Sequence, residues 1–148
     1  MKKIYVASSW RNQFQPQVVE MIKNLGIEVY DFRHPEGRSD GFHWDNISHR
    51  WQDWSVEEYR DALSHPIAKE GFRLDYEAML ACDACVLVLP CGRSAHTEAG
   101  WFAGKGLPVY VLSPIKQEPE LMYKLFDNIF ASIDELQNFL QVKKERNY

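Results

Sequence analysis

A glutamate just beyond a buried strand and a donor-rich turn is the feature of this sequence best suited to chemistry. Residues 86–89 form a continuous apolar run, typical of a strand covered on both faces by helices. A proline and a glycine end this run, and a helical pattern follows. Backbone N–H groups at such a turn lack partners, and Arg93 and Ser94 add donors, so anions should gather there. Glu98 lies one turn into the helix and is expected to face the same turn. A strand end, a turn with hydrogen-bond donors and a carboxylate together are typical of an active site.

The helix that carries Glu98 is expected to lie against the sheet through small residues. These are Ala95, Ala99 and Ala103 on one face, with Gly100 and Gly104 allowing close approach. A glutamate in the first turn also complements the helix dipole without any catalytic role. On the residues alone, both interpretations of Glu98 stay open.

Strand and helix patterns alternate along the chain and position this turn. Strands are expected at 4–7, 27–32, 86–89, 107–112 and 129–131, and helices at 16–25, 55–63, 66–82, 95–104, 121–126 and 132–142. The alternation predicts an α/β fold, a doubly wound, flavodoxin-like three-layer sandwich around a parallel sheet of about five strands. Ligands of such sheets bind beyond the carboxyl ends of the strands. The loops at those ends are 8–12, 31–55, 90–95 and 113–119.

The irregular stretch 33–55 is too long for a plain connector. Such loops are usually functional or disordered, and its tryptophans argue against disorder. Ser55 and Glu58 form a capping box, which predicts a helix towards Leu63, and Pro66 begins another helix. The core residues expected on that second helix are Ile67, Phe72, Tyr76 and Met79.

Length and composition exclude several classes of protein. The 148 residues predict a single domain over 1–148, large enough to bury a core. A net charge of −4 does not favour binding to the phosphate backbone of a nucleic-acid polymer. If the protein binds a compound related to nucleic acids, this should be a monomer. No signal peptide or membrane-spanning run is expected. Three cysteines, an odd number, favour a reducing compartment, and the protein is expected to be cytoplasmic.

Several short segments have an order and spacing that are fairly specific together. They are Lys3–Ser8, Asp75–Asp83, Glu98–Gly100, Gly106–Val111 and Pro119–Met122. In this order they resemble the nucleoside 2-deoxyribosyltransferase family, including the related nucleoside 5′-monophosphate N-glycosidases. The resemblance covers most of the chain except residues 33–70. It implies that Glu98 is the nucleophile of a double displacement at the base–sugar bond. The glutamyl-glycosyl intermediate is then resolved by a second base or by water, with no metal or organic cofactor.

The resemblance also gives Asp75 a role, as the group that assists the departing base. The family has an aspartate eight residues before the one preceding the central strand, which here is Asp83. A nucleophilic carboxylate and a second acid are the standard pair for cleaving a glycosidic bond with retention. The helix dipole favours a charged Glu98 and leaves Asp75 to carry the proton. Without the resemblance, Asp75 is a surface helical residue and Asp83 a cap of the helix end or strand start.

Substrate contacts follow from the same resemblance. In the family the first βα turn lies over the sugar and base and, in monophosphate-cleaving members, helps to hold phosphate. The matching residues are Ser8, Ser9, Trp10 and Arg11. Arg93 and Ser94 could complete a phosphate cradle, although both arginines are equally explained as solvated surface charges. Enzymes that use free nucleosides often have an acid six positions before the nucleophile. Here that position is Gly92, which favours a phosphorylated substrate.

Two further family positions concern oligomers and the chain end. The residue before a Leu-Met pair reaches into a neighbouring subunit's site in the family, and here it is Glu120 rather than asparagine. This implies a homo-oligomer. Some members hold the nucleophile through a C-terminal tyrosine, which Tyr148 matches, although a frayed chain end explains Tyr148 equally well.

Aromatic residues crowd into the stretch 33–55. They are Phe42, Trp44, Trp51 and Trp54. They suit stacking on a nucleobase, with Trp44 as a candidate substrate contact. They equally suit packing of the loop onto the body or a subunit contact, and these alternatives stay open.

Histidines and cysteines give little sign of chemistry. His43, His49 and His96 show no metal-ligand spacing with cysteines, so no metal is expected. Cys82 and Cys85 match the C-x-x-C pattern of redox proteins, in which the first cysteine lies at a helix N-terminus. Here the pair lies between a helix end and the start of a buried strand, so no redox role is expected. Cys91 lies in the turn after the central strand, but the sequence places no general base at a regular spacing from it. Cys91 is therefore not expected to take part in the reaction.

The sequence therefore predicts an N-glycosyl enzyme that acts on a small-molecule nucleoside or nucleoside monophosphate. One alternative is a hydrolase of another N-ribosyl compound such as a dinucleotide. An alternative from a different class is a binding module of the same fold that senses a nucleotide without cleaving it. Glu98 discriminates between them, because a sensor has no need of a carboxylate there.

Overall fold

The computed structural model describes residues 1–146, and the chain divides into two compact units. The first is formed by Met1–Asp31 and Ala81–Tyr148, and the second by Phe32–Leu80. The expected single domain over 1–148 stays a prediction.

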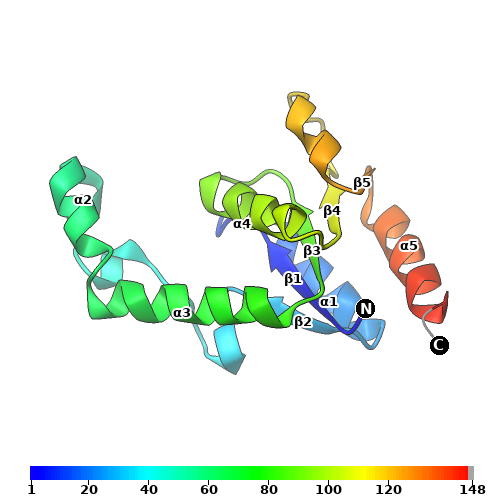
Figure 1. The fold of residues 1–148 in the computed structure, drawn as a ribbon, viewed down its shortest axis with the longest axis horizontal. Coiled ribbons are helices and arrows are strands. Elements are labelled where there is room, and N and C mark those ends of the chain that lie inside the picture. The colour runs from blue at the N-terminus through cyan, green and yellow to red at the C-terminus, as the bar shows by residue number, and fades with distance from the viewer. Residues whose placement is uncertain (147–148) are drawn as a thin grey trace. The chain divides into compact units, whose positions relative to one another are not determined.

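The first unit contains a five-stranded sheet whose neighbouring strands are all parallel (Figure 1). Its strands are β1 (Lys3–Ala7), β2 (Glu28–Asp31), β3 (Ala84–Val88), β4 (Val109–Leu112) and β5 (Asn128–Phe130). They lie in the order β2-β1-β3-β4-β5. Every residue of β3 and β4 is buried, as expected for strands covered on both faces. The predicted doubly wound parallel architecture is confirmed.

The helices of the first unit are α1 (Gln15–Asn24), α4 (Arg93–Gly104) and α5 (Ile133–Arg146), with a short 3₁₀ helix, η4 (Leu121–Leu125). One face of the sheet, which includes Ile4 and Val6, packs against α1 and α5 in the main apolar cluster. Tyr5 lies between these two residues, so its side chain points to the opposite face, where its ring contacts Phe102 of α4 at 5.5 Å between centroids. The sheet thus lies between two helical layers.

Local signals explain where these elements begin and end. Gly26, expected to end α1, has φ +79°, a conformation that favours glycine. Asp83 accepts a hydrogen bond from the backbone N–H of Lys2 at 2.8 Å, which ties the start of β3 to the start of β1. The role of Asp83 is therefore structural, but its side chain bonds the start of β1 instead of the helix end or strand start beside it in the sequence.

The packing of α4 differs from the sequence expectation in one respect. Ala95, Ala99 and Phe102 are buried and form the contact face. Gly100 and Gly104 are exposed, and a Cβ built at either would meet nothing within 4 Å. The expectation that these glycines allow close approach to the sheet is therefore wrong, because they lie on the outer side of the helix.

The second unit is helical. It contains three 3₁₀ turns, η1 (Pro35–Gly37), η2 (Trp44–Asn46) and η3 (Trp51–Asp53), followed by α2 (Val56–Ala62) and α3 (Pro66–Ala81), whose last residue lies in the first unit. The capping box at the start of α2 is confirmed, since Ser55 accepts from the N–H of Glu58 and Glu58 accepts from that of Ser55, each at 3.1 Å.

The exposed face of α3 contradicts part of the predicted core. Met79 is buried, but Ile67, Phe72 and Tyr76 are 38%, 67% and 38% exposed. The buried residues of α3 are Ala68, Leu74, Ala78 and Met79. At 100° per residue, Phe72 lies about 20° from Met79 and Tyr76 about 60° from it, so both lie at the edge of the buried face, where the apolar surface continues into solvent.

Among residues 1–146, no helix combines the length and apolar character that crossing a membrane requires.

Candidate functional site

Glu98 lies on α4, where its carboxylate meets the side chain of a buried tyrosine. The hydroxyl of Tyr5 donates a hydrogen bond to Oε2 of Glu98. Tyr5 lies in the middle of β1 with none of its surface exposed, and its ring stacks on that of Tyr30 of β2 at 5.1 Å. A hydroxyl donor aimed at a carboxylate stabilises its charged form and fixes its orientation. Glu98 itself is partly exposed.

The thiols around Glu98 are held in their protonated state. Burial, together with the charge of Glu98, raises the pKa of Cys91 to about 12 and raises that of Cys85 well above its usual value. Burial likewise raises the pKa of Cys82 to about 12. A nucleophilic or redox-active cysteine needs a lowered pKa. None of the three thiols is therefore activated as a nucleophile.

The first βα turn is tied to the turn after β3. The hydroxyl of Ser8 donates to the carbonyl of Val88 at 2.9 Å. The side-chain amide of Asn12 donates to the carbonyls of Val88 and Pro90 at 3.3 and 3.0 Å, while its oxygen accepts from the N–H groups at the start of α1. Ser8 is buried and its proton is committed to Val88, so its role here is structural. Asn12 was not predicted, and it joins the two turns that flank the site.

The remaining predicted residues of this turn lie closer to solvent. Ser9 is partly buried, and its hydroxyl accepts from the N–H of Arg11 at 3.2 Å. Trp10 and Arg11 are exposed. Arg11 forms no ion pair with the part of the chain that the structure describes. These side chains are accessible to a ligand at the carboxyl end of β1.

The N-terminus of α4 presents backbone donors without a side-chain cap. Gly92 is the N-cap residue, and its neighbours Arg93 and Ser94 are exposed. No ion pair holds Arg93 within residues 1–146. Free N–H groups at a helix N-terminus, a guanidinium and a hydroxyl together suit an anion such as phosphate.

His96 connects α4 to η4. Its Nε2 lies 2.7 Å from the hydroxyl of Tyr123, and its Nδ1 lies 2.8 Å from the carbonyl of Gly92. Because a carbonyl only accepts, Nδ1 carries a proton, and neutral His96 accepts at Nε2 from Tyr123. The contact with Tyr123 was not predicted from the sequence. This contact ties the segment that carries Glu120 to α4, the helix of Glu98.

Glu120 is exposed and caps η4, with Oε2 accepting from the N–H of Met122 at 2.7 Å. Leu121 and Met122 are also exposed. Its predicted reach into a neighbouring subunit stays a prediction. Tyr148, which matches the C-terminal tyrosine that holds the nucleophile in some members of the resembled family, lies outside the described residues.

The second unit carries Asp75 and Trp44. Asp75 is partly exposed on α3. Trp44 packs edge-on against Phe42, Trp54 and Tyr59 at 4.8 to 6.1 Å between ring centroids. These contacts favour the interpretation in which the aromatic residues pack the loop. Since Asp75 and Glu98 belong to different units, their convergence on one sugar stays a prediction.

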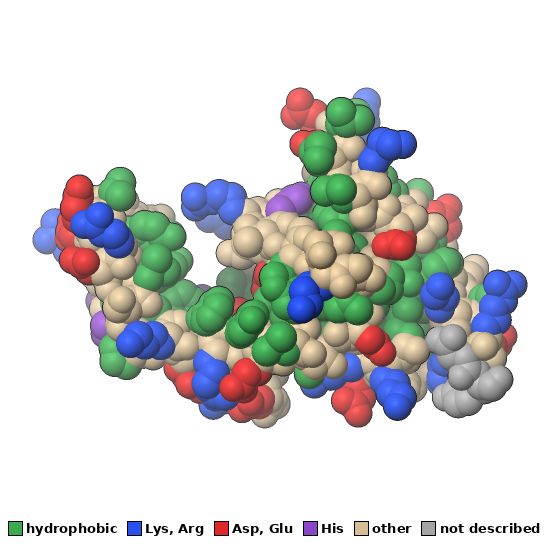
Figure 2. Space-filling view, in the orientation of Figure 1, with side chains coloured by type: hydrophobic (Ala, Val, Ile, Leu, Met, Phe, Trp, Pro, Cys, Tyr) green, Lys and Arg blue, Asp and Glu red, His purple; other side chains and the backbone are tan. Residues whose placement is uncertain are grey.

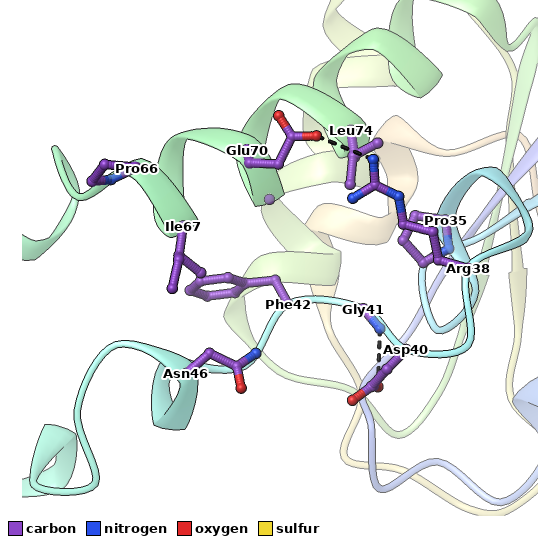
Figure 3. A pocket seen from close by; sticks show the side chains of 11 residues that line it. Pro35, Arg38, Asp40, Gly41, Phe42, Asn46, Pro66, Ile67, Glu70 and Leu74 are labelled. Atoms are coloured by element: carbon purple, nitrogen blue, oxygen red, sulfur yellow. Dashed lines mark hydrogen bonds and ion pairs between the residues drawn. The ribbon is translucent and has the colours of Figure 1, made fainter.

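A cavity of about 300 Å³ lies within the second unit, between the loop 35–46 and α3 (Figure 3). Phe42 and Ile67 line its apolar side, while Arg38 and Glu70 form a pair at 3.4 Å across from them. No residue predicted to bind substrate lines this cavity. Leu74 lines it and is followed in the sequence by Asp75, which does not.

Within residues 1–146, no group of three or more His, Cys, Asp and Glu side chains is placed to hold a metal ion.

Sequence reasoning missed Tyr5 and Asn12. The signal for Tyr5 was a hydroxyl within an otherwise apolar strand, because a buried tyrosine hydroxyl needs a partner. The signal for Asn12 was a side chain with both a donor and an acceptor just after a strand.

The sheet order and the strand-end site define a flavodoxin-like α/β protein. No protein-family model matches the chain, and comparison with curated proteins returns no match. Solved structures share the fold over nearly its whole length. A 2-deoxyribosyltransferase from Bacillus psychrosaccharolyticus has a TM-score of 0.63 and 21% identity, covering 92% of this chain and 90% of that one.

Two other structures extend the comparison. A conserved protein from Enterococcus faecalis V583 has a TM-score of 0.60 and 19% identity, covering 98% of this chain and 99% of its own. A CMP N-glycosidase from Clostridium botulinum has a TM-score of 0.54 and 16% identity, covering 94% of this chain and 98% of its own. The enzymes that the sequence resembles are therefore also found among proteins that share its fold.

Proposed function

We propose that the protein cleaves the base–sugar bond of a nucleoside or nucleotide by double displacement, with Glu98 as the nucleophile. The observation that carries this proposal is the hydrogen bond from buried Tyr5 to the carboxylate of Glu98, on the helix that follows the central strand. A glutamate that only complements a helix dipole needs no such partner. The names of two proteins of the same fold, a 2-deoxyribosyltransferase and a CMP N-glycosidase, support the same chemistry.

The proposed reaction has two steps. A carboxylate oxygen of Glu98 forms a bond to the anomeric carbon while the bond from that carbon to the base nitrogen breaks. Asp75 gives its proton to the base, which leaves neutral. A second base or a water molecule then attacks the same carbon from the face opposite its ester bond to Glu98. The acceptor loses a proton to Asp75, and the ester bond breaks, which frees Glu98.

We propose a 5′-monophosphate as the substrate. Gly92 stands where an acid would repel phosphate, and Arg93 and Ser94 are exposed beside uncapped N–H groups. Arg11, exposed in the first βα turn, supplies a second guanidinium. Removing Arg93 should therefore raise KM for a monophosphate more than for its free nucleoside.

The test is incubation of the full chain with a panel of nucleosides and their 5′-monophosphates, with and without an added free base. Base released with water alone identifies a hydrolase, and an exchanged base identifies a transferase. Bound but intact ligand identifies a sensor and overturns the proposal.

Glu98→Gln keeps the size of the side chain and removes the nucleophile. Turnover is expected to fall by about 10⁴-fold or more, because the covalent route is lost. Mass spectrometry of wild-type protein quenched during turnover should show one glycosyl adduct, which Glu98→Gln should lack. Activity that survives in Glu98→Gln and in Glu98→Ala would show that the mechanism is wrong.

A further inference from the structure

The side chain of His96 holds the peptide group at which α4 begins. Gly92, the N-cap residue, has an extended conformation with φ −99° and ψ −153° and, within residues 1–146, no side-chain cap. Its carbonyl accepts from the backbone N–H of His96 at 3.3 Å and from Nδ1 of the same residue at 2.8 Å. Because the backbone bond is long, the side chain supplies the shorter of the two bonds that fix this carbonyl.

Fixing this carbonyl also fixes a hydrogen-bond donor. The carbonyl of Gly92 and the N–H of Arg93 belong to one planar trans peptide group, so they point in opposite directions. The carbonyl points along α4 towards His96, and the N–H therefore points out from the start of the helix. Helical geometry leaves the N–H of this first residue without a partner inside the helix. The side chain of His96 thus orients a backbone donor that it does not touch.

Tyr123 determines which nitrogen of His96 carries the proton. Its hydroxyl donates to Nε2 at 2.7 Å, and the two rings stack with 5.8 Å between centroids. An imidazole that accepts at Nε2 keeps its single proton on Nδ1, where the bond to Gly92 needs it. Sγ of Cys91 lies 3.6 Å from Nδ1, but burial and the charge of Glu98 raise the pKa of this thiol to about 12. The thiol therefore stays protonated and does not take the proton from Nδ1.

We propose that His96 is a positioning residue for the phosphate of the substrate, acting through the peptide group between Gly92 and Arg93. Tyr123 sets the tautomer, His96 sets the peptide plane, and the N–H of Arg93 donates to a phosphate oxygen. A hydrogen bond from a fixed N–H to a charged oxygen is stronger than a neutral one, so the direction of this donor should affect affinity. This inference rests on the 5′-monophosphate proposed as the substrate.

The contact lies at the surface of the first unit, where a substitution leaves the core intact. Figure 2 shows histidine surface between α4 and the segment that precedes β5, and His96 is the only histidine in either. A purely structural tie between α4 and η4 is the alternative role for this residue. Such a tie would need Tyr123 as much as His96, and its loss would affect phosphorylated and free substrates alike.

The first experiment follows the backbone amide of Arg93 by NMR while ribose 5-phosphate is added to the full chain. The amide proton is expected to move downfield in the wild type with ribose 5-phosphate but not with ribose. His96→Ala should bind ribose 5-phosphate about tenfold more weakly, because the donor is no longer fixed. His96→Asn, whose side-chain amide takes the place of Nδ1, should stay within about threefold of the wild type.

The same spectra show whether each variant is folded. An Arg93 amide that does not respond in the wild type would overturn the inference, and so would unchanged affinity in His96→Ala. If His96→Ala does not fold, His96→Asn decides instead, since binding about tenfold weaker than in the wild type would mean that the bond to Gly92 is not the one that matters.

Thr97→Val is the matched control. The hydroxyl of Thr97 donates to the carbonyl of Arg93 at 2.8 Å, one peptide group further along. That group lies inside the helix, where regular backbone bonds already hold it. Thr97→Val should therefore bind ribose 5-phosphate as tightly as the wild type. A loss equal to that of His96→Ala would mean that any side chain bonded to this turn matters, and His96 would have no special role.

The second experiment measures steady-state kinetics with a nucleoside 5′-monophosphate and with its free nucleoside. His96→Ala should raise KM for the monophosphate about tenfold, with KM for the free nucleoside and both kcat values within about twofold. Tyr123→Phe keeps the imidazole donor and only stops fixing its tautomer, so it should raise KM for the monophosphate by about threefold or less.

Equal losses on both substrates, or a Tyr123→Phe defect as large as that of His96→Ala, would indicate a structural tie and overturn the inference. If the wild type cleaves neither substrate, the proposed reaction is wrong. The titration with ribose 5-phosphate then still decides whether His96 positions the donor, so the two failures are distinguishable.

Discussion

The hydroxyl of Tyr5 is the smallest part of the site whose removal tests it. Tyr5→Phe deletes one buried oxygen and leaves the ring stacked between β2 and α4. A hydrogen bond to a charged group contributes about 1.5 to 3 kcal/mol. Only the part of this contribution that is larger in the transition state than in the ground state changes the rate, and here that part comes from fixing the orientation of the carboxylate. Since about 1.4 kcal/mol corresponds to a tenfold change in rate, kcat is expected to fall by about tenfold and by no more than about 100-fold. The measurement is steady-state kinetics on the best substrate of the panel.

The control for this prediction is Tyr110→Phe. Tyr110 is also a buried tyrosine of the sheet, but it lies on β4, where its ring packs against Phe139 of α5 rather than against the Glu98 helix. Tyr110→Phe should leave kcat within about twofold of the wild type. Equal losses in both variants would mean that a hydroxyl anywhere in the sheet matters, and Tyr5 would then have no special role towards Glu98.

The family resemblance gave Gly92 its significance, whereas residue types with their neighbours were sufficient to make Glu98 a candidate and to give Asp83 a structural role. They were not sufficient for Tyr5, because its partner is 93 positions away and parallel pairing of β1 with β3 is needed to bring the two together. Asn12 was missed for the same reason, since its acceptors Val88 and Pro90 are carbonyls, which sequence does not distinguish.

The missing side chain at Gly71 of α3 allows the loop 35–46 to pack closely on this helix. A Cβ added there would lie 2.9 Å from Cβ of Phe42 and 3.0 Å from its ring. Alanine normally stabilises a helix interior over glycine by about 1 kcal/mol. Here the clash with Phe42 should outweigh that gain, and Gly71→Ala is expected to destabilise the protein by about 1 to 3 kcal/mol.

Gly100 provides the matched control, because a Cβ on that helical glycine meets nothing within 4 Å. Gly100→Ala should raise the free energy of unfolding by about 0.5 to 1 kcal/mol. Urea denaturation of both variants measures the two changes. Stabilisation of both would show that the loop yields to the extra methyl group and that the Phe42 contact is not tight.

The pair formed by Glu70 and Arg73 in the N-terminal half of α3 should make the stability of the protein depend on pH. Hydrogen bonds from Arg73, at 2.6 and 2.8 Å, and its charge lower the pKa of Glu70 to about 2 from its usual 4.5. Because the folded-state pKa is the lower one, the stabilisation is fully present above pH 4.5. It declines as the unfolded chain takes up its proton below that pH, and it is lost as pH falls through about 2.

NMR titration of the Glu70 carboxyl carbon tests this. The midpoint should lie near pH 2 in the wild type and return towards 4.5 in Arg73→Gln. Since this pair is exposed to solvent, the melting temperature should change little between the two proteins at neutral pH. A wild-type midpoint already near 4.5 would contradict the Arg73 contact.

The elements themselves were largely predictable, and their faces were less so. Capping residues, Gly26 and the buried runs gave the helices and strands of both units. Part of the core predicted on α3 was wrong because periodicity finds an apolar face without showing how much of its width the protein buries. Phe72 and Tyr76 were assigned to the core because of their type, whereas Ala68 and Ala78 are the residues that fit there.

At the scale of the whole molecule, the fold persists where sequence similarity is low. Structures at 16% to 21% identity cover nine tenths or more of the chain. A buried parallel sheet demands apolar runs and strand-end turns but tolerates many exchanges within them. For this reason the doubly wound architecture around a parallel sheet followed from the sequence.

The proposed reaction requires both units, because Glu98 belongs to the first and Asp75 to the second. If Asp75 donates the proton to the departing base, Asp75→Asn should lower the rate by about 10²- to 10⁴-fold on an ordinary substrate. An analogue whose base carries a fixed positive charge, such as an N7-methylpurine, needs no proton to leave, so Asp75→Asn should cleave it at nearly the wild-type rate. Glu98→Gln should fail on both substrates, because every leaving group needs the nucleophile. Single-turnover rates for the two variants on the two substrates separate these roles. An Asp75→Asn defect of equal size on the charged base would mean that Asp75 positions the substrate rather than protonating it.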